Sequence, residues 1–512
     1  MPEITLRNIT KRWGKFFGVD HLDLDISDNS FITLLGPSGC GKSTFLKILS
    51  GQLEPTNGEV AITPGQRLSF LQQDHFKYDE YTVLDTVIMG NKRLYDIMKE
   101  KDAIYMKEEF TDEDGIKAAE LEGEFATMNG WEAESDAENL LNGLGIETEL
   151  HYKTMKDLLG PQKVKVLLAQ ALFGNPDILL LDEPTNYLDV QHIEWLKRYL
   201  QDYENAFILI SHDIPFLNSV VNLIYHMENQ KLDRYVGDYD RFMEVYEMKK
   251  SQLEAAYNRQ QAEIAKLQDF VARNKARVAT RNMAMSRQKK LDKMEVIELA
   301  KEKPKPEFHF LNARATGKLI FETKDLVIGY DEPLSKPLNF LMERGEKIAV
   351  IGANGIGKTT FLKSIQGLIP AISGTVEVGD YQFPGYFEQE MAPGNTTTCI
   401  EEIWKEFPSY TQYEVRSALA KCGLTTKNIE SQVRVLSGGE QAKVRLCKLM
   451  NRETNVLLLD EPTNHLDVDA KDELKRALSE YKGAVLLICH EPEFYDGLVS
   501  KVWDLSKWSL KI

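Results

Sequence analysis

The stretch GPSGCGKST at residues 36–44 is the most informative part of this chain. A strand-like apolar run, Phe31–Leu35, precedes it, and a helical pattern follows from Phe45. In such a context glycines let backbone N–H groups converge on a phosphate, and the helix N-terminus adds a favourable dipole. The lysine reaches the terminal phosphate oxygens, and the next residue offers a hydroxyl to Mg²⁺. The sequence therefore predicts an α/β fold with a phosphate-binding loop; the alternative is a glycine-rich turn with a surface lysine.

The loop recurs later in the chain together with the motifs that follow it. GANGIGKTT (352–360) repeats the loop, VLLLDEPTNHLD (456–467) repeats ILLLDEPTNYLD (178–189), and LLICHE (486–491) repeats ILISHD (208–213). In both halves 31 residues separate the loop lysine from a downstream glutamine, and 30 separate the DEPTN aspartate from a histidine. Two copies of one domain explain these equal spacings, which makes the turn-only interpretation negligible.

The two copies differ in length at one place. Gln73 lies 85 residues before Leu158, whereas Gln389 lies 47 before Leu436, so the first copy carries 38 extra residues, near 91–135. The acidic insertion predicts a helical hairpin that turns around Thr111–Gly115, with Thr111 and Asp114 forming an N-terminal cap. A plain surface ornament is the alternative.

The copies cover roughly residues 1–238 and 316–512, and the segment 239–315 has a different composition. It predicts a long charged helix over residues 243–275, a short break near 279–282 and a second helix to about residue 301. KEKPKPEF (301–308) then breaks the helix, because proline lacks a donor N–H. We therefore expect two antiparallel helices between two α/β domains.

Composition excludes several classes of protein. The net charge of −17, from 62 basic and 79 acidic residues, argues against sequence-independent nucleic-acid binding by the whole surface. No run approaches the roughly 20 apolar residues that span a bilayer, and the first residues do not resemble a signal peptide. The five scattered cysteines form no CxxC pair, which argues against disulfides or a zinc ribbon. We expect a cytoplasmic protein.

Carboxylates and histidines at the ends of predicted strands are the candidate catalytic groups. Asp182 and Asp460 each end an apolar run and suit a Mg²⁺ site. Glu183 and Glu461 follow directly and could polarise an attacking water, although capping of the next turn is the alternative. The histidines at 212 and 490 end the next strand and could contact a γ-phosphate; a purely structural role is the alternative.

Residues 271–290 concentrate positive charge in the linker. This stretch holds seven basic and no acidic residues, which predicts contact with the backbone of folded RNA. A solvated helix face is the alternative. The candidate RNA contacts are Arg273, Lys275, Arg277, Arg281, Arg287, Lys289 and Lys290.

Taken together, LSGGE (436–440), the two loops, the paired glutamines and the DEPTN strings resemble tandem ATP-binding cassettes. Without a membrane domain and with a charged helical linker, the layout resembles the ATP-binding cassette F family of ribosome-associated ATPases, and most of all its energy-dependent translational throttle type and close bacterial relatives. The fold class implied is α/β, two P-loop cassettes joined by a helical hairpin.

The resemblance implies a set of site residues and cofactors. ATP and Mg²⁺ are the implied cofactors, hydrolysis to ADP and phosphate the reaction, and Glu183, Glu461, His212 and His490 the catalytic residues. Mg²⁺ would be held by Ser43, Gln73, Asp182, Thr359, Gln389 and Asp460. Asp189 and Asp467 would communicate between the cassettes. Trp13 and Tyr330 would stack on adenine, although both could equally be core residues. The remaining ATP contacts would be Gly36, Pro37, Ser38, Gly39, Cys40, Gly41, Lys42, Ser43, Thr44, Gly352, Ala353, Asn354, Gly355, Ile356, Gly357, Lys358, Thr359, Thr360, Ser437, Gly438, Gly439 and Glu440.

The resemblance also implies partners. In the ATP state the protein would bind the ribosomal E site, touch P-site tRNA and rRNA through the linker, and reach the L1 stalk side through the insertion, whose acidity favours a basic ribosomal protein. The function implied is regulation or rescue of translation. No membrane partner is expected, and the two cassettes of one chain would pair with each other, so a monomer suffices. Alternatives are antibiotic resistance by ribosome protection, which the short linker tip disfavours, the ATPase of a transporter, and a DNA-maintenance ATPase.

The first signature departs from the family pattern. It reads Leu158-Leu159-Gly160-Pro161-Gln162, so Leu159 lacks the hydroxyl, and Pro161 the N–H, that would donate to a phosphate. In a head-to-tail pair this signature serves the ATP on Lys358. We therefore expect the Lys358 site to close or hydrolyse more poorly, unless the rest of the helix start compensates.

Overall fold

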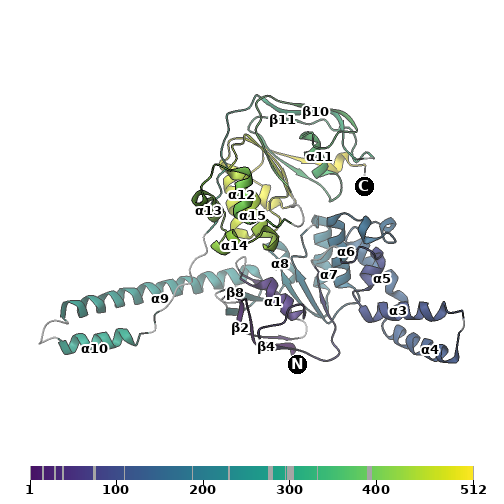
Figure 1. Cartoon of the computed structure of the whole chain (residues 1–512), viewed down its shortest axis with the longest axis horizontal. Helices are drawn as coiled ribbons and strands as arrows, with labels where there is room; N and C mark the ends of the chain where they lie inside the picture. The colour runs from purple at the N-terminus through teal and green to yellow at the C-terminus, as the bar shows by residue number, and fades with distance from the viewer. Residues whose placement is uncertain are drawn as a thin grey trace.

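The computed structural model describes residues 2–13, 16–27, 30–36, 40–72, 77–108, 110–186, 188–228, 231–274, 281–294, 296, 305–330, 332–388 and 395–510. Two similar α/β domains lie against each other, and two helical hairpins project from the first of them toward opposite sides (Figure 1). The arrangement is the α/β pair of cassettes with a helical linker that the repeat predicts.

The first cassette is built on a six-stranded sheet in the order β5-β6-β7-β3-β8-β9. All neighbours run parallel except β8 and β9. Its strands are β3 (Phe31–Leu35), β5 (Leu68–Phe70), β6 (Ile178–Asp182), β7 (Ala206–Ile210), β8 (Leu223–Glu228) and β9 (Lys231–Val236). Every residue of β6 and β7 is buried, as expected for a parallel sheet covered on both faces. A separate antiparallel sheet has the order β2-β1-β4, with β1 (Pro2–Trp13), β2 (Phe16–Ser27) and β4 (Asn57–Ile62).

The second cassette repeats this plan. Its parallel sheet has the order β14-β15-β16-β12-β17, from β12 (Lys347–Ile351), β14 (Pro384–Phe387), β15 (Val456–Asp460), β16 (Ala484–Ile488) and β17 (Lys501–Asp504). The antiparallel sheet has the order β11-β10-β13, from β10 (Leu319–Val327), β11 (Leu341–Glu343) and β13 (Ser373–Val378). The register of β15 against β16 brings Asp460 opposite Ile488 at the carboxyl edge of the sheet, where ligands of open α/β sheets bind.

Helices cover these sheets in a similar order in both copies, with one more helix in the second among the described residues. In the first cassette they are α1 (Lys42–Leu49), α2 (Val83–Ile88), α5 (Ala133–Gly143), α6 (Gly160–Leu172), α7 (Val190–Gln201) and α8 (Ile214–Val220). In the second they are α11 (Lys358–Ile365), α12 (Cys399–Glu406), α13 (Gln412–Lys421), α14 (Thr426–Glu430), α15 (Gly438–Met450), α16 (Val468–Glu480) and α17 (Pro492–Tyr495).

The insertion of the first cassette forms a helical hairpin, which we call the arm. It consists of α3 (Lys92–Tyr105) and α4 (Asp112–Thr127). Thr111 caps α4 in a reciprocal capping box with Asp114, which confirms the predicted cap. The turn, however, precedes Thr111 instead of extending to Gly115, because the box starts a new helix there.

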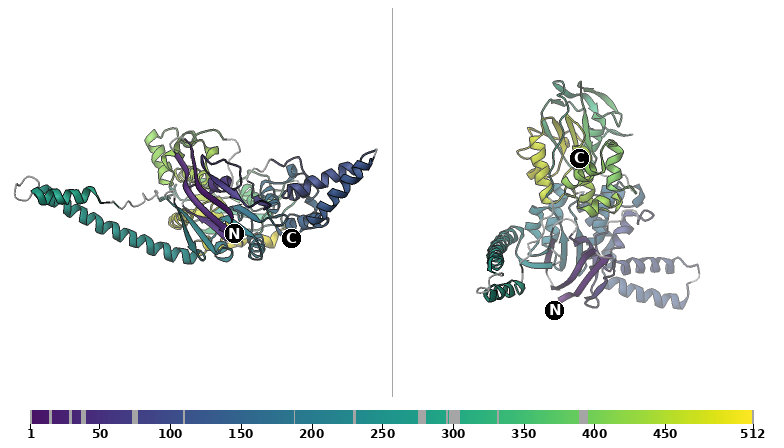
Figure 2. Two further views of the ribbon diagram at one scale, coloured as in Figure 1. Left: turned by 90° about the horizontal axis from the view of Figure 1, so that it is seen from below. Right: turned by 60° about the vertical axis from the view of Figure 1, so that its left-hand side comes forward.

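The linker is a second hairpin, of α9 (Tyr239–Asn274) and α10 (Arg281–Asp292). Figure 2 shows that it extends away from the cassettes at the end opposite the arm. The predicted second helix does not continue past Asp292, where α10 ends, and residues 297–301 of that prediction lie outside the described residues.

The base of α9 is fixed to the first cassette by an aromatic cluster. The Phe242 ring lies 5.4 Å from that of Tyr246, 5.0 Å from that of Tyr235 and 5.3 Å from that of His226, centroid to centroid. The Tyr246 hydroxyl donates to Glu228 at 3.1 Å. These contacts join the linker rigidly to β8 and β9.

Candidate active site

Each phosphate-binding loop ends where a helix begins. Helix α1 starts at Lys42 and α11 at Lys358, so both lysines lie at helix N-termini. The preceding glycines, Gly41 and Gly357, have φ values of 104° and 101° in the left-handed region. A Cβ atom on Gly41 would lie 2.1 Å from the carbonyl oxygen of Gly18, so no other residue fits.

Both loop lysines are buried and point into their own loops. The Lys358 ammonium donates to the carbonyls of Gly352 at 2.9 Å and Ala353 at 2.8 Å, and lies 3.3 Å from Asn354 Oδ1. Lys42 donates to the Gly36 carbonyl. Burial lowers the pKa of Lys358 to about 8, so this ammonium gains from any anion that replaces neutral acceptors.

Paired carboxylates stand at the ends of β6 and β15, as predicted from the DEPTN strings. Asp182 and Asp460 are the last residues of these strands. The next residues, Glu183 and Glu461, have φ values of 52° and 48°. Non-glycine residues in this region are strained and concentrate at functional sites. Nothing in the sequence indicated this backbone strain at Glu183 and Glu461.

The Asp460 carboxylate is suited to a cation. It is 1 % exposed, and both of its oxygens are buried without a hydrogen-bond partner among the residues that the structure describes. Burial and the charge of Glu461 raise its pKa to about 6. A buried carboxylate with this environment costs stability unless a cation pairs with it. Oxygen ligands from Asp460 and the nearby Thr359 therefore fit Mg²⁺.

Each strand-end glutamate faces the histidine of the neighbouring strand. His212 Nε2 lies 3.4 Å from Glu183 Oε1, and His490 Nε2 lies 3.2 Å from Glu461 Oε1. Burial, followed by the charge of Asp182, raises the pKa of Glu183 to about 8. Burial also raises the pKa of Glu461, but His490 and Lys358 outweigh it, so that pKa is lowered overall. The two equivalent glutamates thus differ in environment.

The two signature helices start differently. The Ser437 hydroxyl accepts the N–H of Glu440, whose carboxylate accepts the N–H of Ser437 at 2.9 Å. In the first cassette Leu159 occupies the cap position with a 68 % exposed side chain. Gln162 retains one bond of the box, from the Leu159 N–H at 3.0 Å. The start of α6 is therefore preserved, but the Leu159 side chain cannot replace the hydroxyl that Ser437 provides in α15.

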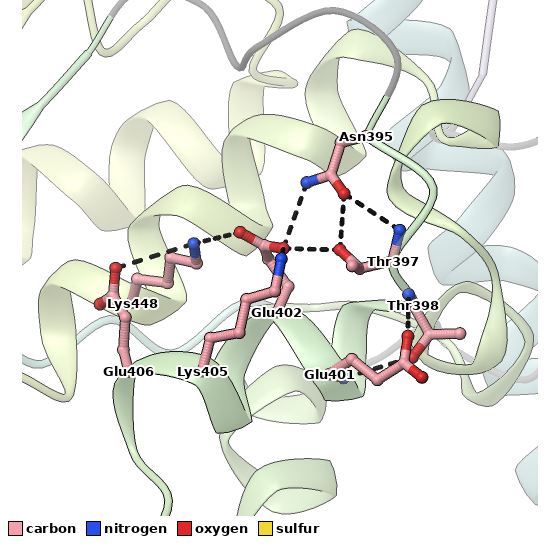
Figure 3. Close-up of polar contacts among 8 residues, drawn as sticks. All are labelled: Asn395, Thr397, Thr398, Glu401, Glu402, Lys405, Glu406 and Lys448. Atoms are coloured by element: carbon pink, nitrogen blue, oxygen red, sulfur yellow. Dashed lines mark hydrogen bonds and ion pairs between the residues drawn. The ribbon is translucent and has the colours of Figure 1, made fainter.

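The signature helix α15 is tied to α12 by a buried carboxylate. Glu402 Oε1 accepts from the Lys448 ammonium at 2.5 Å, and Oε2 accepts from the Thr397 hydroxyl at 2.6 Å and from Asn395 Nδ2 at 3.1 Å (Figure 3). Burial opposes ionisation, but these donors lower the pKa of Glu402 to about 2. Sequence reasoning missed this network, because its members carry no motif.

Contacts between the cassettes join equivalent loops of the two DEPTN strings. Asn186 Nδ2 of the first cassette lies 3.0 Å from His465 Nδ1 of the second. Asp189 Oδ2 accepts the backbone N–H of Asn354, in the second phosphate-binding loop, at 3.2 Å. The phosphate-binding loop of the second cassette therefore meets Asp189 of the first, and the two DEPTN strings meet each other.

Apart from Tyr330, the other predicted site residues either lie at the starts of helices or fall outside the described residues. Tyr330 is 65 % exposed, so it is not a core residue. Cys40, Ser43 and Thr44 lie at the start of α1, and Gly355, Ile356, Thr359 and Thr360 at the start of α11; Gly438, Gly439 and Glu440 form the first turn of α15. Outside the described residues are Pro37, Ser38, Gly39, Gln73, Gln389, Lys275 and Arg277, together with the side chains of Trp13 and Arg281.

Part of the basic charge of the linker is used within the hairpin. Arg273 pairs with Asp269 at 2.9 Å, Lys290 pairs with Glu263 at 2.6 Å, and the Arg287 guanidinium packs 3.6 Å from the centre of the Phe270 ring. Lys289 is exposed and has no ion pair within the described part of the linker. Among the described basic residues of the linker, Lys289 could therefore bind a phosphate without first breaking an ion pair, whereas Arg273 and Lys290 could not.

Each half of the chain has a strand, a phosphate-binding loop, a helix and a pair of carboxylates. This arrangement, present twice, defines a tandem ATP-binding cassette ATPase of the P-loop type. Family models described as "ABC transporter" match residues 19–186 and 335–464, and another with the same description matches 225–310. The chain belongs to the ATP-binding cassette F family.

Relatives support this assignment, and a solved structure shares the fold. The "Uncharacterized ABC transporter ATP-binding protein YfmM" of Bacillus subtilis is 57 % identical over 100 % of both chains. "ABC transporter F family member 2" of Arabidopsis thaliana is 32 % identical over 98 % of this chain and 76 % of that protein. The structure of an archaeal ribosome recycling factor, in complex with a ribosomal stalk protein, matches with a TM-score of 0.58 at 19 % identity, over 97 % of this chain and 87 % of that one, which shows the shared fold. In the described ranges no helix has the length and apolar character needed to cross a membrane.

Proposed function

We propose that this ATPase acts on the ribosome: in the ATP state it binds the E site, contacts P-site tRNA and rRNA through the linker, and regulates or rescues translation. The linker hairpin is the observation that carries the proposal. It projects far from both cassettes, and its end holds the basic stretch of an otherwise acidic chain (Figure 2). A projecting cationic tip suits the phosphates of a folded RNA.

Two further observations support the proposal. The related fold belongs to an archaeal ribosome recycling factor. The arm projects on the side opposite the linker (Figure 2), so the chain has two extended elements with which to touch a large partner. The arm is the element that we assign to a protein of the L1 stalk.

The proposal assigns a role to each of the site residues. Lys42 and Lys358 would bind the phosphates of ATP, with the N–H groups of their loops. Mg²⁺, when bound, neutralises phosphate charge, and Ser43, Gln73 and Asp182, or Thr359, Gln389 and Asp460, would hold it. Glu183 and Glu461 would orient the attacking water, and His212 and His490 would hold those glutamates and face the γ-phosphate.

The decisive experiment uses a chain that binds ATP without hydrolysing it. The double variant Glu183→Gln/Glu461→Gln is centrifuged with 70S ribosomes in ATP, in ADP and without nucleotide. We expect retention on ribosomes with ATP alone, and loss of that retention when the seven basic residues of 271–290 are neutralised. A control neutralises Lys475, Lys482 and Lys507 on the second cassette and should retain binding.

Each alternative predicts a different result. Absence of retention under every nucleotide condition would overturn the translation proposal and leave the linker as a solvated helical pair. A protective shift in drug susceptibility on expression would instead favour ribosome-protection resistance. Retention that is insensitive to the linker substitutions would exclude the tRNA contact.

A further inference from the structure

The aspartate that crosses between the cassettes is held differently in the two halves. Asp189 caps helix α7, since its Oδ1 accepts the N–H of His192 at 3.1 Å. The His192 ring adds a second bond to the same oxygen, because Nδ1 lies 2.5 Å from Asp189 Oδ1. A carboxylate cannot donate, so the proton of this bond lies on Nδ1. The other oxygen, Oδ2, is left to accept the Asn354 N–H of the second cassette.

The equivalent aspartate of the second cassette has a different neighbour. Asp467 caps α16 in the same way, but the residue that corresponds to His192 is Ala470. There the lysine of the signature helix, Lys443, donates directly to Asp467 Oδ2 at 2.9 Å. In the first cassette the corresponding Lys165 lies 3.3 Å from His192 Nδ1 instead. With its proton on Nδ1, His192 donates to Asp189 and cannot also accept from Lys165, so the histidine takes the place of the signature-helix lysine at the aspartate.

The His192 ring packs against Gly145, where a larger residue would leave no room for it. A Cβ atom on Gly145, which follows α5, would lie 2.1 Å from His192 Nε2. Asp189 is 3 % exposed, so its contacts are protected from water. A cavity of about 230 Å³ opens beside Asp189 and is lined by residues of both cassettes, among them Gly352 and His490.

We propose that His192 is a positioning residue: it fixes the Asp189 carboxylate so that Oδ2 holds the Asn354 N–H, and so orders the phosphate-binding loop of the Lys358 site. Asn354 also contacts the Lys358 ammonium through its side chain, so the link continues to the group that meets the phosphates. In the head-to-tail pairing that the family resemblance implies, this site would be completed by the altered Leu159–Pro161 signature. His192 thus supports ATP binding at the half-site that lacks signature donors. The inference rests on the proposed assignment of Lys358 to an ATP site.

The test compares the two sites in the full chain. Lys42→Ala leaves the Lys358 site, and Lys358→Ala leaves the Lys42 site; binding of a fluorescent N-methylanthraniloyl ATP with Mg²⁺ is titrated in each background. We expect His192→Ala to weaken binding about tenfold at the Lys358 site, as loss of one charge-assisted hydrogen bond would. At the Lys42 site we expect less than a twofold change. His192→Asn, whose amide donates from a similar position, should recover most of the loss.

The control and the contrary outcomes are distinct. Arg198→Ala, on the exposed side of the same helix, should change neither site. Equal weakening at both sites, or no weakening at the Lys358 site, would overturn the positioning role, as would failure of Asn to rescue while the melting temperature is unchanged. No binding at all in the Lys42→Ala chain would instead overturn the assignment of the Lys358 site itself, and with it the inference.

Discussion

Glu402 and Lys448 form an ion pair at 2.5 Å in the second cassette, at the positions where the first cassette has Thr86 and Gln170. In the first cassette the same two helices meet through neutral groups, since Gln170 Nε2 donates to the Thr86 carbonyl at 2.8 Å. The charged version supports the helix with the intact Ser437 signature. The two copies have therefore diverged in how they hold their signature helices, and not only in the signatures.

We predict that Glu402→Gln destabilises the second cassette by about 3 kcal/mol, because it leaves a largely buried ammonium without its carboxylate. The effect should depend on pH with a defined sign. The pKa of Glu402 is lowered to about 2, so the stabilisation is present above about pH 4.5 and is lost as pH falls toward 2. Urea unfolding of both chains, at pH 7 and at successively lower pH, measures the difference.

Glu406→Gln is the matched control for this change. Glu406 lies 3.7 Å from Lys448 but is more exposed, so its loss should cost less than about 1 kcal/mol. Equal destabilisation by the two substitutions, or a difference that persists unchanged below pH 3, would show that the Glu402 pair is not the stabilising contact.

Much of this molecule could be predicted from its sequence because its chemistry lies in contiguous motifs. The loop at residues 36–44 fixes a strand before it and a helix after it, and the strand β3 (Phe31–Leu35) has the predicted bounds. The repeat then supplied the second cassette. The Thr111 cap could also be predicted from the sequence, because a capping box needs only residues three positions apart.

What the sequence did not predict depends on contacts between distant residues or on backbone strain. The Glu402 network joins α12 to α15, and the link from His192 to Asn354 crosses between cassettes, so neither has a local pattern. The left-handed backbone at Glu183 and Glu461 is imposed by the turn after each strand and not by residue type. The end of α10 at Asp292 was missed because the helical pattern continues toward the prolines.

The altered signature leads to a second prediction, on hydrolysis. In the proposed head-to-tail pairing Ser437 would serve the Lys42 site and Leu159 the Lys358 site, so Glu183→Gln should remove most of the ATPase turnover, and Glu461→Gln little of it. Loss of one charge-assisted hydrogen bond corresponds to roughly a 10- to 150-fold difference between the sites. Steady-state phosphate release measures both variants. Similar residual turnover in the two would contradict the asymmetry, and Leu159→Ser with Pro161→Gly should raise turnover in the Glu183→Gln chain.

The buried Asp460 leads to a prediction that separates stability from activity. Its pKa is raised to about 6, so its ionisation costs folding free energy at pH values above its ordinary pKa, and the full cost is present above pH 6. Asp460→Asn should therefore stabilise the nucleotide-free, Mg²⁺-free chain by about 2 kcal/mol at pH 8 and not at pH 4, while it lowers Mg²⁺-dependent turnover at the Lys358 site.

Thermal melting at the two pH values tests this. The control is Asp469→Asn, at an exposed position of α16, which should change neither property. A lower melting temperature for Asp460→Asn at pH 8 would mean that the carboxylate already has a stabilising partner, and the fit to Mg²⁺ would lose its support.

The anchor of the linker leads to the last prediction. Phe242 is 5 % exposed and packs against the rings of Tyr246, Tyr235 and His226, so Phe242→Ala should cost about 3–5 kcal/mol of local packing. We expect faster hydrogen exchange at the base of α9 and in β8 and β9, with ATP binding by the cassettes unchanged. Because the hairpin would no longer move with the first cassette, ATP-dependent retention on ribosomes should fall.

Met248→Ala, at an exposed position of the same helix, is the control. Retention that is unchanged in a chain with a loosened α9 base would show that the tip reaches its partner without a rigid connection to the ATP sites.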